Sequence, residues 1–230
     1  MCANFQPISA TQAPLFTNQQ LALPSNRIFT QAMNPPCYLL TSYQIREVIL
    51  PSGTQPCLEW CLNGPKIPIL PNKLMIPVET VMDKPSFKHA WYNNQFALIP
   101  VQTIYEPKYI NGKAHRYGIH REDNEPFTVA GLYEMVKIGD QLIRSMTMLT
   151  INADQHPFMS QFHKPEDEKR SIVVIEPQHR TDWLNMTHEN AFELLLPMGE
   201  GYTAEYRPKP SKTHDSAPNE DLLDLLLPKS

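Results

Sequence analysis

The chain begins Met1-Cys2, so that removal of the initiator methionine would leave an amine and a thiol on one residue. We expect this removal, because a small second side chain favours it. Such an aminothiol condenses with an aldehyde to a Schiff base, and the thiol then closes a thiazolidine ring. An α-amine titrates at about pH 8, so a useful part of it is unprotonated at neutral pH. The plain alternative is that position 2 only tolerates a small residue.

The composition bounds the kind of protein. The 230 residues fit one large domain or two small ones, and 41% of them are apolar, enough for a core. The 23 prolines against 8 glycines predict extended segments and fixed turns rather than long helices. No apolar run is long enough to span a bilayer, and the N-terminus lacks a signal pattern. We therefore expect a cytoplasmic protein without a membrane segment.

The other cysteines and the net charge limit the possible partners. Cys37, Cys57 and Cys61 lack companions at ligand spacing, which favours buried thiols in a reducing compartment and predicts no metal or other cofactor. The net charge of −4 does not indicate a general nucleic-acid binder. A DNA site in this chain must therefore be a local basic groove with salt-sensitive binding.

Local patterns predict many short strands and a few helices. We expect strands over residues 37–40, 45–50, 96–101, 116–120, 128–133, 144–151 and 171–175, and helices over 84–92, 153–162, 179–185 and 188–195. This mixture predicts an α+β fold with a strongly bent, barrel-like mixed or antiparallel sheet and a few flanking helices. We expect one domain over residues 1–205 and a flexible tail over 206–230.

Several short motifs follow one another in order over most of residues 2–185. They are Met1-Cys2 with Phe5, Asn34-Pro35-Pro36, Glu59-Trp60-Cys61-Leu62, Pro77-Val78-Glu79-Thr80, Lys84-Pro85-Ser86-Phe87-Lys88-His89-Ala90-Trp91, Leu98-Ile99-Pro100 with Tyr105-Glu106, Ala130-Gly131-Leu132-Tyr133-Glu134, His163, and Arg170-Ser171-Ile172-Val173-Val174-Ile175. Their order resembles the SOS-response-associated peptidase family, whose members trap abasic sites in single-stranded DNA covalently. The fold expected above is similar to the one this resemblance implies.

The resemblance implies roles for three residues. Cys2 would be the covalent residue, Glu106 the acid that opens the deoxyribose ring, and His163 an acid/base beside the new ring. Proton exchange at neutral pH suits a buried carboxylic acid and an imidazole. Without the resemblance, Glu106 would be taken for a surface carboxylate and His163 for an exposed histidine.

The chain departs from the family pattern at positions where family members contact DNA. Met75 stands where the family has an asparagine that bonds the adduct, and Pro77 stands in place of a phosphate-binding arginine. Residues 164–169 form an insertion after His163. Asn72 or Asn4 could supply the missing amide. The resemblance therefore implies a divergent, bacterial-type member with fewer of the residues that contact DNA in the family.

The remaining DNA contacts would come from basic and aromatic side chains. The candidates for phosphate contacts are Lys84, Lys88, Arg116 and Arg170, and those for base stacking are Trp60 and Trp91, with Tyr105 beside them. Each has a plain alternative. The two tryptophans stand in apolar contexts typical of a core, and Lys84 and Lys88 have the spacing of a solvated helix face.

Three functions stay open. The first is a sensor that crosslinks abasic sites in single-stranded DNA and shields them, a nucleoid-associated role in the DNA damage response. The second is a hydrolase of the peptidase or lyase kind, in which Cys2 is a nucleophile with His163 as its base. The third is a degenerate DNA-binding module without chemistry, which the substitutions at Met75 and Pro77 motivate.

The tail ends in a short apolar and acidic segment. Its residues Asp221, Leu222, Leu223, Leu225 and Leu226 loosely resemble the motif by which bacterial proteins dock on the replication sliding clamp. A docking motif of this kind would raise the concentration of the sensor at replicating DNA. The alternative is a final element that packs its leucines on the body.

Overall fold

A computed structural model of the 230-residue chain describes residues 4–8, 43–50, 53–60, 75–138 and 141–208. Within these, the strands over 43–60 and 135–145 are described by their backbone alone. Cys2, the expected strand at 37–40, Asn72 and the tail segment from 209 lie outside the described residues.

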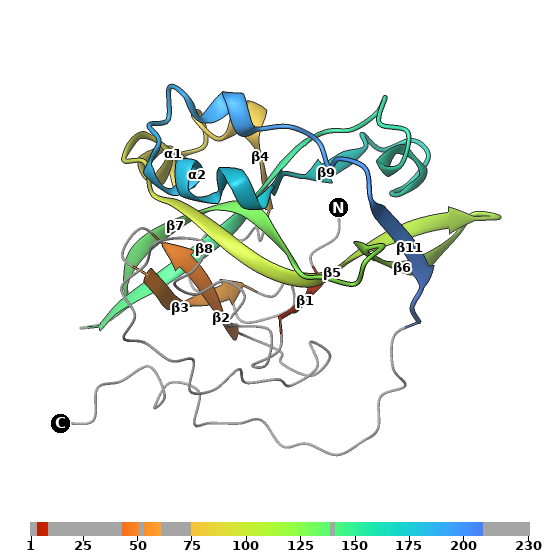
Figure 1. Ribbon diagram of the computed structural model, residues 1–230, viewed down its shortest axis with the longest axis horizontal. Helices are drawn as coiled ribbons and strands as arrows, with labels where there is room; N and C mark the ends of the chain where they lie inside the picture. Colours follow the sequence, from red (N-terminus) through yellow and green to blue (C-terminus); the bar gives the residue numbers. More distant parts are fainter. Residues whose placement is uncertain (1–3, 9–42, 51–52, 61–74, 139–140, 209–230) are drawn as a thin grey trace, which may run out of the picture.

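The fold is α+β and is built on one mixed sheet, as the sequence predicts (Figure 1). The order of its main path is β10-β7-β8-β3-β2-β5-β6-β11, while β1 pairs with β5, and β4 and β9 pair with β8. The strands are β1 (Asn4–Pro7), β2 (Tyr43–Leu50), β3 (Gly53–Trp60), β4 (Met75–Pro77), β5 (Phe96–Ile110), β6 (Lys113–Arg121), β7 (Phe127–Ile138), β8 (Gln141–Asn152), β9 (Arg170–Ile172), β10 (Val174–Ile175) and β11 (Tyr202–Tyr206). The strands β1, β3, β4 and β11 lie outside every range that the sequence patterns predict.

The expected barrel-like closure is not confirmed. The long strand β5 pairs with β7 along six residues and with β6 along seven, which makes the centre of the sheet continuous. The two links that would complete a ring are single residue pairs, Ile49 with Leu98 and Leu58 with Ser145. A barrel needs ladders between all neighbouring strands, so we describe the sheet as open and bent.

A tight turn fixes the register of the hairpin formed by β5 and β6. Asn111 and Gly112 connect the strands with φ values of 51° and 74°. Two consecutive residues in this left-handed region are typical of a type I′ turn, for which Asn-Gly is the favoured sequence. The turn pairs Ile110 with Lys113 and, further along the ladder, Glu106 with Tyr117.

Two of the predicted helices are confirmed, and both pack on the sheet (Figure 1). They are α1 (Pro85–Tyr92), which packs on β7, and α2 (Arg180–Asn185), which packs on β5. Proline at the first position suits α1 because the missing N–H has no intrahelical partner there. Short 3₁₀ turns complete the helical part: η2 (Val78–Thr80), η3 (Met159–Gln161), η4 (Pro177–His179) and η5 (Ala191–Leu194).

The helices expected over 153–162 and 188–195 are wrong, and only the turns η3 and η5 form there. In the first segment, the Nδ1 atom of His156 accepts the backbone N–H groups of Phe158 and Met159, which replaces helical hydrogen bonds. In the second, the backbone N–H groups of Asn190 and Ala191 both donate to the carbonyl of Thr187, and the Thr187 hydroxyl donates to Glu189. Local side-chain bonds of this kind compete with helix formation.

Buried side chains form two clusters. One lies around Phe5, Ile99 and Met148, where β1, β5 and β8 meet. The other lies beneath the helices, where Phe96 contacts Trp91 and Trp183 with ring centroids 5.6 and 4.6 Å apart. No helix in the described part of the chain is long and apolar enough to cross a membrane.

Candidate functional site

Glu106 and His163 meet in the interior of the protein. Glu106 lies in the second half of β5, and His163 follows η3 and forms a parallel bridge with Lys108 of the same strand. The Nε2 atom of His163 lies 2.9 Å from the Oε2 atom of Glu106, and the two side chains are 2% and 4% exposed. The structure thus brings together two of the three residues for which the sequence predicts chemistry.

The backbone of His163 adopts a rare conformation. Its φ is 64°, in the left-handed region that side chains other than glycine seldom occupy. A hydrogen bond of 2.7 Å from its backbone N–H to the carbonyl of Pro107 holds it there. Because β5 continues from Glu106 to Pro107, this bond fixes the imidazole beside the carboxylate. Strain of this kind concentrates at functional sites.

Three polar atoms of this pair have no hydrogen-bond partner among the described residues. They are Oε2 of Glu106 and both ring nitrogens of His163, since the short contact between the two side chains lacks the angles of a hydrogen bond. An unsatisfied buried polar atom costs about 1–3 kcal/mol. Native proteins keep few such atoms, and those they keep call for an explanation such as catalysis. The pair is therefore arranged to receive further donors and acceptors.

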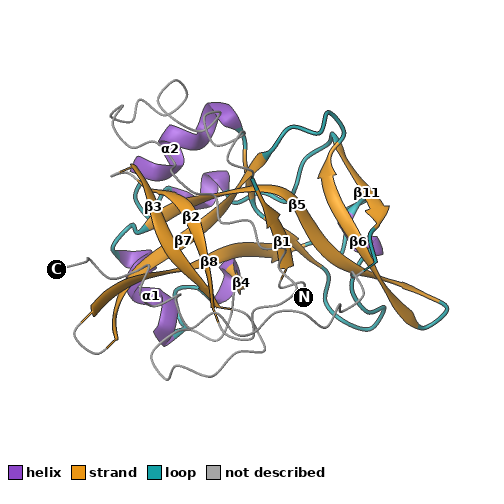
Figure 2. Ribbon diagram, turned by 90° about the horizontal axis from the view of Figure 1, so that it is seen from below, coloured by secondary structure: helices purple, strands orange, loops and turns teal. Residues whose placement is uncertain are grey.

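The N-terminal end of the first strand lies beside this pair. The strand β1 runs antiparallel to β5, with Asn4 opposite Tyr105 and Phe5 opposite Ile104 (Figure 2). Since antiparallel strands advance in opposite directions, the N-terminal end of β1 faces the part of β5 that holds Glu106. Phe5 is 1% exposed in the first core cluster, which anchors the strand. Cys2 itself lies outside the described residues.

Arg170 forms a second ionic group. Its side chain is 5% exposed and donates two hydrogen bonds to Glu79, at 2.7 and 3.1 Å, and one to Glu168. A further bond of 2.8 Å reaches the carbonyl of Thr150. These bonds tie η2 to β8 and β9. Contact between Arg170 and a phosphate stays a prediction. In the structure, its hydrogen bonds give it a structural role.

Glu79 keeps its charge in this group. Burial acts to raise its pKa, but hydrogen bonds from Arg170 and from the backbone N–H of Asn152 outweigh burial and leave the pKa below its ordinary value. Sequence reasoning missed Glu79 as a partner of Arg170, although both residues belong to motifs of the predicted order. Their contact joins segments far apart in the chain, which no local pattern reports.

The candidate DNA contacts do not gather around the pair. Lys84, the N-cap of α1, and Lys88, within α1, are both exposed, and α1 packs on β7. The guanidinium of Arg116 lies 3.3 Å above the ring of Tyr105 and donates to the carbonyl of Arg207. Trp91 is fully buried, so its indole belongs to the core and cannot stack on a base in this structure.

The remaining sequence candidates are placed as follows. Trp60 is the last residue of β3, and its side chain lies outside the description. Met75 is 4% exposed in the first core cluster, so an apolar side chain fills the position of the family's asparagine. Pro77 closes β4. The insertion after His163 is mostly exposed. No group of three or more His, Cys, Asp or Glu in the described residues could hold a metal ion.

Comparisons with known proteins agree with this arrangement. The sequence model of the family described as "SOS response associated peptidase (SRAP)" matches residues 65–209. No curated protein matches the chain. A solved protein from Bordetella bronchiseptica is 25% identical with a TM-score of 0.69, and the match covers 89% of this chain and 99% of that one.

Two further solved structures share the fold. A protein from Bacteroides thetaiotaomicron is 16% identical with a TM-score of 0.56, over 79% of this chain and 76% of that one. A phage-related protein from Bordetella bronchiseptica is 16% identical with a TM-score of 0.51, over 74% of this chain and 79% of that one. At this identity the likeness supports the fold alone.

Proposed function

Because the chain belongs to the SOS response associated peptidase family, we propose that it senses abasic sites in single-stranded DNA and binds them covalently through Cys2. The observation that carries this proposal is the buried pair of Glu106 and His163, 2.9 Å apart, with three polar atoms that lack partners in the described residues. Such a pair is prepared to exchange protons with a reacting group.

The start of the chain has only a short distance to cover. Two peptide units join Cys2 to Asn4, and they span at most about 7 Å. Asn4 is paired with Tyr105, the neighbour of Glu106. A mature N-terminus therefore has the length to reach the pair. Its amine and thiol would supply the partners that the unsatisfied atoms of Glu106 and His163 require.

The proposed reaction combines an aldehyde and an aminothiol with the loss of one water. Glu106 donates a proton to the ring oxygen of the abasic sugar and takes up the proton of the C1′ hydroxyl, and the ring opens to the aldehyde. The amine of Cys2 attacks the aldehyde carbon, and the resulting carbinolamine loses water to form a Schiff base. The thiol of Cys2 then gives its proton to His163, the sulfur bonds to the same carbon, and the imine nitrogen takes up a proton. The product is a thiazolidine that links protein and DNA.

The same two side chains can run the reaction in either direction. A carboxylate and an imidazole in contact can pass protons between them, so Glu106 can be returned to its starting state without bulk water. The crosslink shields the sugar from strand scission, because the open aldehyde that undergoes β-elimination is consumed.

A single measurement tests the proposal. The full-length protein is incubated with a single-stranded oligonucleotide that carries one abasic site, and the mixture is analysed by intact mass and on a denaturing gel. We expect loss of Met1 and one DNA adduct per chain. The Cys2→Ala variant should form no stable adduct, and Cys2→Ser should form at most a Schiff base that borohydride traps.

A second thiol provides the control. Cys37→Ser removes a thiol that the proposed reaction does not use, so its adduct should equal that of the unsubstituted protein. The proposal fails if the unsubstituted chain, with Cys2 at its N-terminus, forms no adduct. It also fails if Cys2→Ser forms a full adduct without borohydride.

A hydrolase is the second candidate, because the family description contains the word peptidase. It would use the thiol of Cys2 as nucleophile and a ring nitrogen of His163 as its base. Peptide turnover that an abasic oligonucleotide abolishes by occupying Cys2 would favour it. An adduct without any peptide turnover would favour the sensor.

A further inference from the structure

The exposed end of the hairpin β5–β6, together with β11, carries a line of aromatic rings that starts beside His163. Phe162 lies 6.4 Å from Tyr117, Tyr117 lies 6.0 Å from Tyr206, and Tyr206 lies 5.8 Å from His115, all measured between ring centroids. We name these four residues the aromatic ladder. Phe162 is fully buried, whereas Tyr206 is 56% exposed. The ladder therefore leads from the core to solvent.

The strand register places the ladder on the same face as Glu106. Glu106 lies opposite Tyr117 on β6, and Tyr117 lies opposite Tyr206 on β11. Residues directly opposite one another in neighbouring strands point to the same face. At about 4.8 Å from strand to strand, Tyr206 stands about 10 Å from Glu106 across the sheet. The exposed ring is thus a near neighbour of the proposed reactive pair.

Cations accompany the ladder. The Nζ atom of Lys108 lies 5.5 Å above the ring of Tyr117 and donates to Gln161. Lys108 is paired with His115, and Lys113 is paired with Ile110 on the same face. Within β5, β6 and β11, Glu106 is the single acidic residue on this face. The opposite face differs, because Glu205 there pairs with His120 and Arg207.

We propose that Tyr206, supported by Tyr117 and Lys108, is a stacking platform for an unpaired nucleobase next to the abasic site. Exposed aromatic rings flanked by lysines bind single strands because every base has a face that can stack, while the cations attract the backbone. The ladder satisfies both conditions and is continuous with the proposed site. This inference rests on the proposed function for the identity of the strand.

The test compares two single strands that differ in their bases alone. Both contain a tetrahydrofuran residue, which imitates an abasic site without an aldehyde. In one strand the neighbouring nucleotides carry bases, and in the other they lack them. Binding to the full-length protein is followed by fluorescence anisotropy at one fixed low salt concentration. The protein should bind the strand with bases more tightly.

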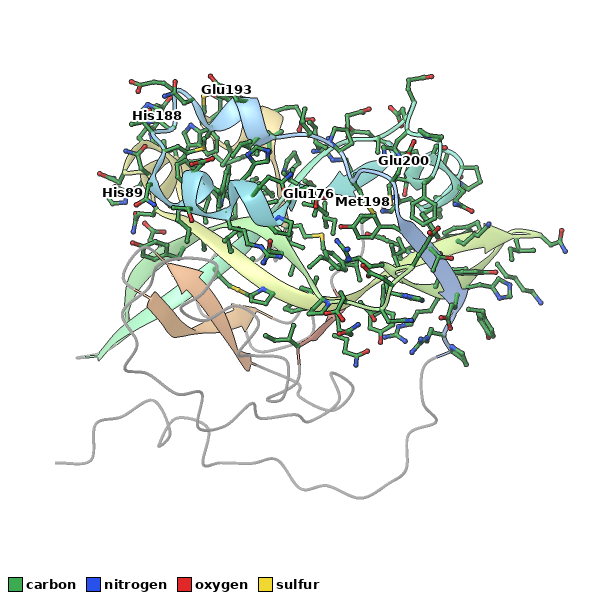
Figure 3. All side chains as sticks on the ribbon, in the orientation of Figure 1. His89, Glu176, His188, Glu193, Met198 and Glu200 are labelled. Atoms are coloured by element: carbon green, nitrogen blue, oxygen red, sulfur yellow. The ribbon has the colours of Figure 1, made fainter. Side chains whose placement is uncertain are left out.

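The substitutions at Tyr206 are surface changes that leave the core intact. Tyr206→Ala should weaken binding of the strand with bases about tenfold and leave binding of the other strand unchanged. Tyr206→Phe keeps the ring and should restore tight binding. Tyr92→Ala is the matched control, since Tyr92 is 51% exposed and contacts His188, which lies at the end of the molecule opposite the hairpin tip (Figure 3).

Each outcome decides the inference. Equal weakening on both strands, no weakening, or no preference of the unsubstituted protein for bases would overturn it. The covalent reaction is scored separately with an aldehyde-bearing strand. If that reaction is absent while the effect of Tyr206→Ala persists, the platform stands and the proposed chemistry falls. If the crosslink forms while Tyr206→Ala binds both strands normally, the chemistry stands and the platform falls.

Discussion

Replacing Glu106 with Gln preserves the size of the side chain and removes its ability to take and give a proton. Loss of a general acid or base slows a reaction about 10²–10⁴-fold. We expect the lower end, about 100-fold, because His163 remains 2.9 Å away and can carry part of the proton traffic. This loss corresponds to about 2.7 kcal/mol in the activation barrier. The single-turnover rate of adduct formation on an abasic oligonucleotide measures it.

The same substitution should not lower stability. The Oε2 atom of Glu106 has no hydrogen-bond partner in the described residues, so replacing the carboxyl group with an amide removes no hydrogen bond of this atom. The melting temperature of Glu106→Gln should therefore equal or exceed that of the unsubstituted protein. A protein that melts earlier and still reacts at full rate would refute the assignment, because Glu106 would then be a structural residue.

Glu79→Gln is the matched control, since it is the same chemical change at the other buried ionic group. It weakens the two hydrogen bonds that Arg170 donates and leaves a buried guanidinium undercompensated. We expect a loss of about 1 kcal/mol in the free energy of unfolding. The loss is small because the Glu79 side chain is 45% exposed and water screens its charge. The crosslinking rate should stay the same. The two variants thus have opposite signatures in rate and stability.

The contribution of Glu79 to the free energy of unfolding should also depend on pH. Its pKa lies below the ordinary 4.5, despite burial, because of the hydrogen bonds from Arg170 and Asn152. A carboxylate with a lowered pKa stabilises the fold fully above its unfolded pKa, and this stabilisation is lost as the pH falls through the folded value. The stability difference between the unsubstituted protein and Glu79→Gln should therefore be constant near neutral pH and shrink below about pH 4.5. A difference that grows on acidification would contradict this sign.

Three further changes test other parts of the structure. His163→Gly should be about 1 kcal/mol more stable than His163→Ala in chemical denaturation, because φ there is 64° and glycine tolerates it, while both should slow adduct formation and reversal rather than weaken DNA affinity. Gly131→Ala should cost about 2 kcal/mol, because the new Cβ would lie 2.7 Å from the carbonyl oxygen of Thr147, whereas Gly199→Ala meets nothing within 4 Å and should be neutral. If the tail docks on the sliding clamp, deleting 211–230 should remove clamp binding and preserve both the melting temperature and the crosslinking rate; if the tail packs on the body, the deletion should lower the melting temperature by a large amount.

Local patterns in the sequence were sufficient for much of the fold. The alternation and β-branched content of β5 to β8 predict strands, and Pro85 at the first turn predicts the start of α1. These features depend on near neighbours in the chain. Where a side chain takes over backbone hydrogen bonds, as His156 does, the same patterns predict a helix that does not form.

The order of motifs determined the family, and with it Glu106 and His163 as candidates for chemistry. Residue types alone could not place them together, because burial and distance depend on how distant segments pack. The Asn111-Gly112 turn already implied that Glu106 lies opposite Tyr117, since a two-residue hairpin sets its own register. From that turn alone, Tyr117 and His115 of the aromatic ladder could have been predicted to lie on the same face as Glu106.

Only the tertiary structure decided the rest. A parallel bridge between His163 and Lys108 of β5 holds the segment after η3 beside that strand, where His163 lies 2.9 Å from Glu106 with a φ of 64°. Pairing of β11 with β6 adds Tyr206 to the ladder, and packing of α1 buries Trp91 completely. Each of these contacts joins residues far apart in the chain. Their free energy comes from burial shared across the whole core, which no local stretch of sequence contains.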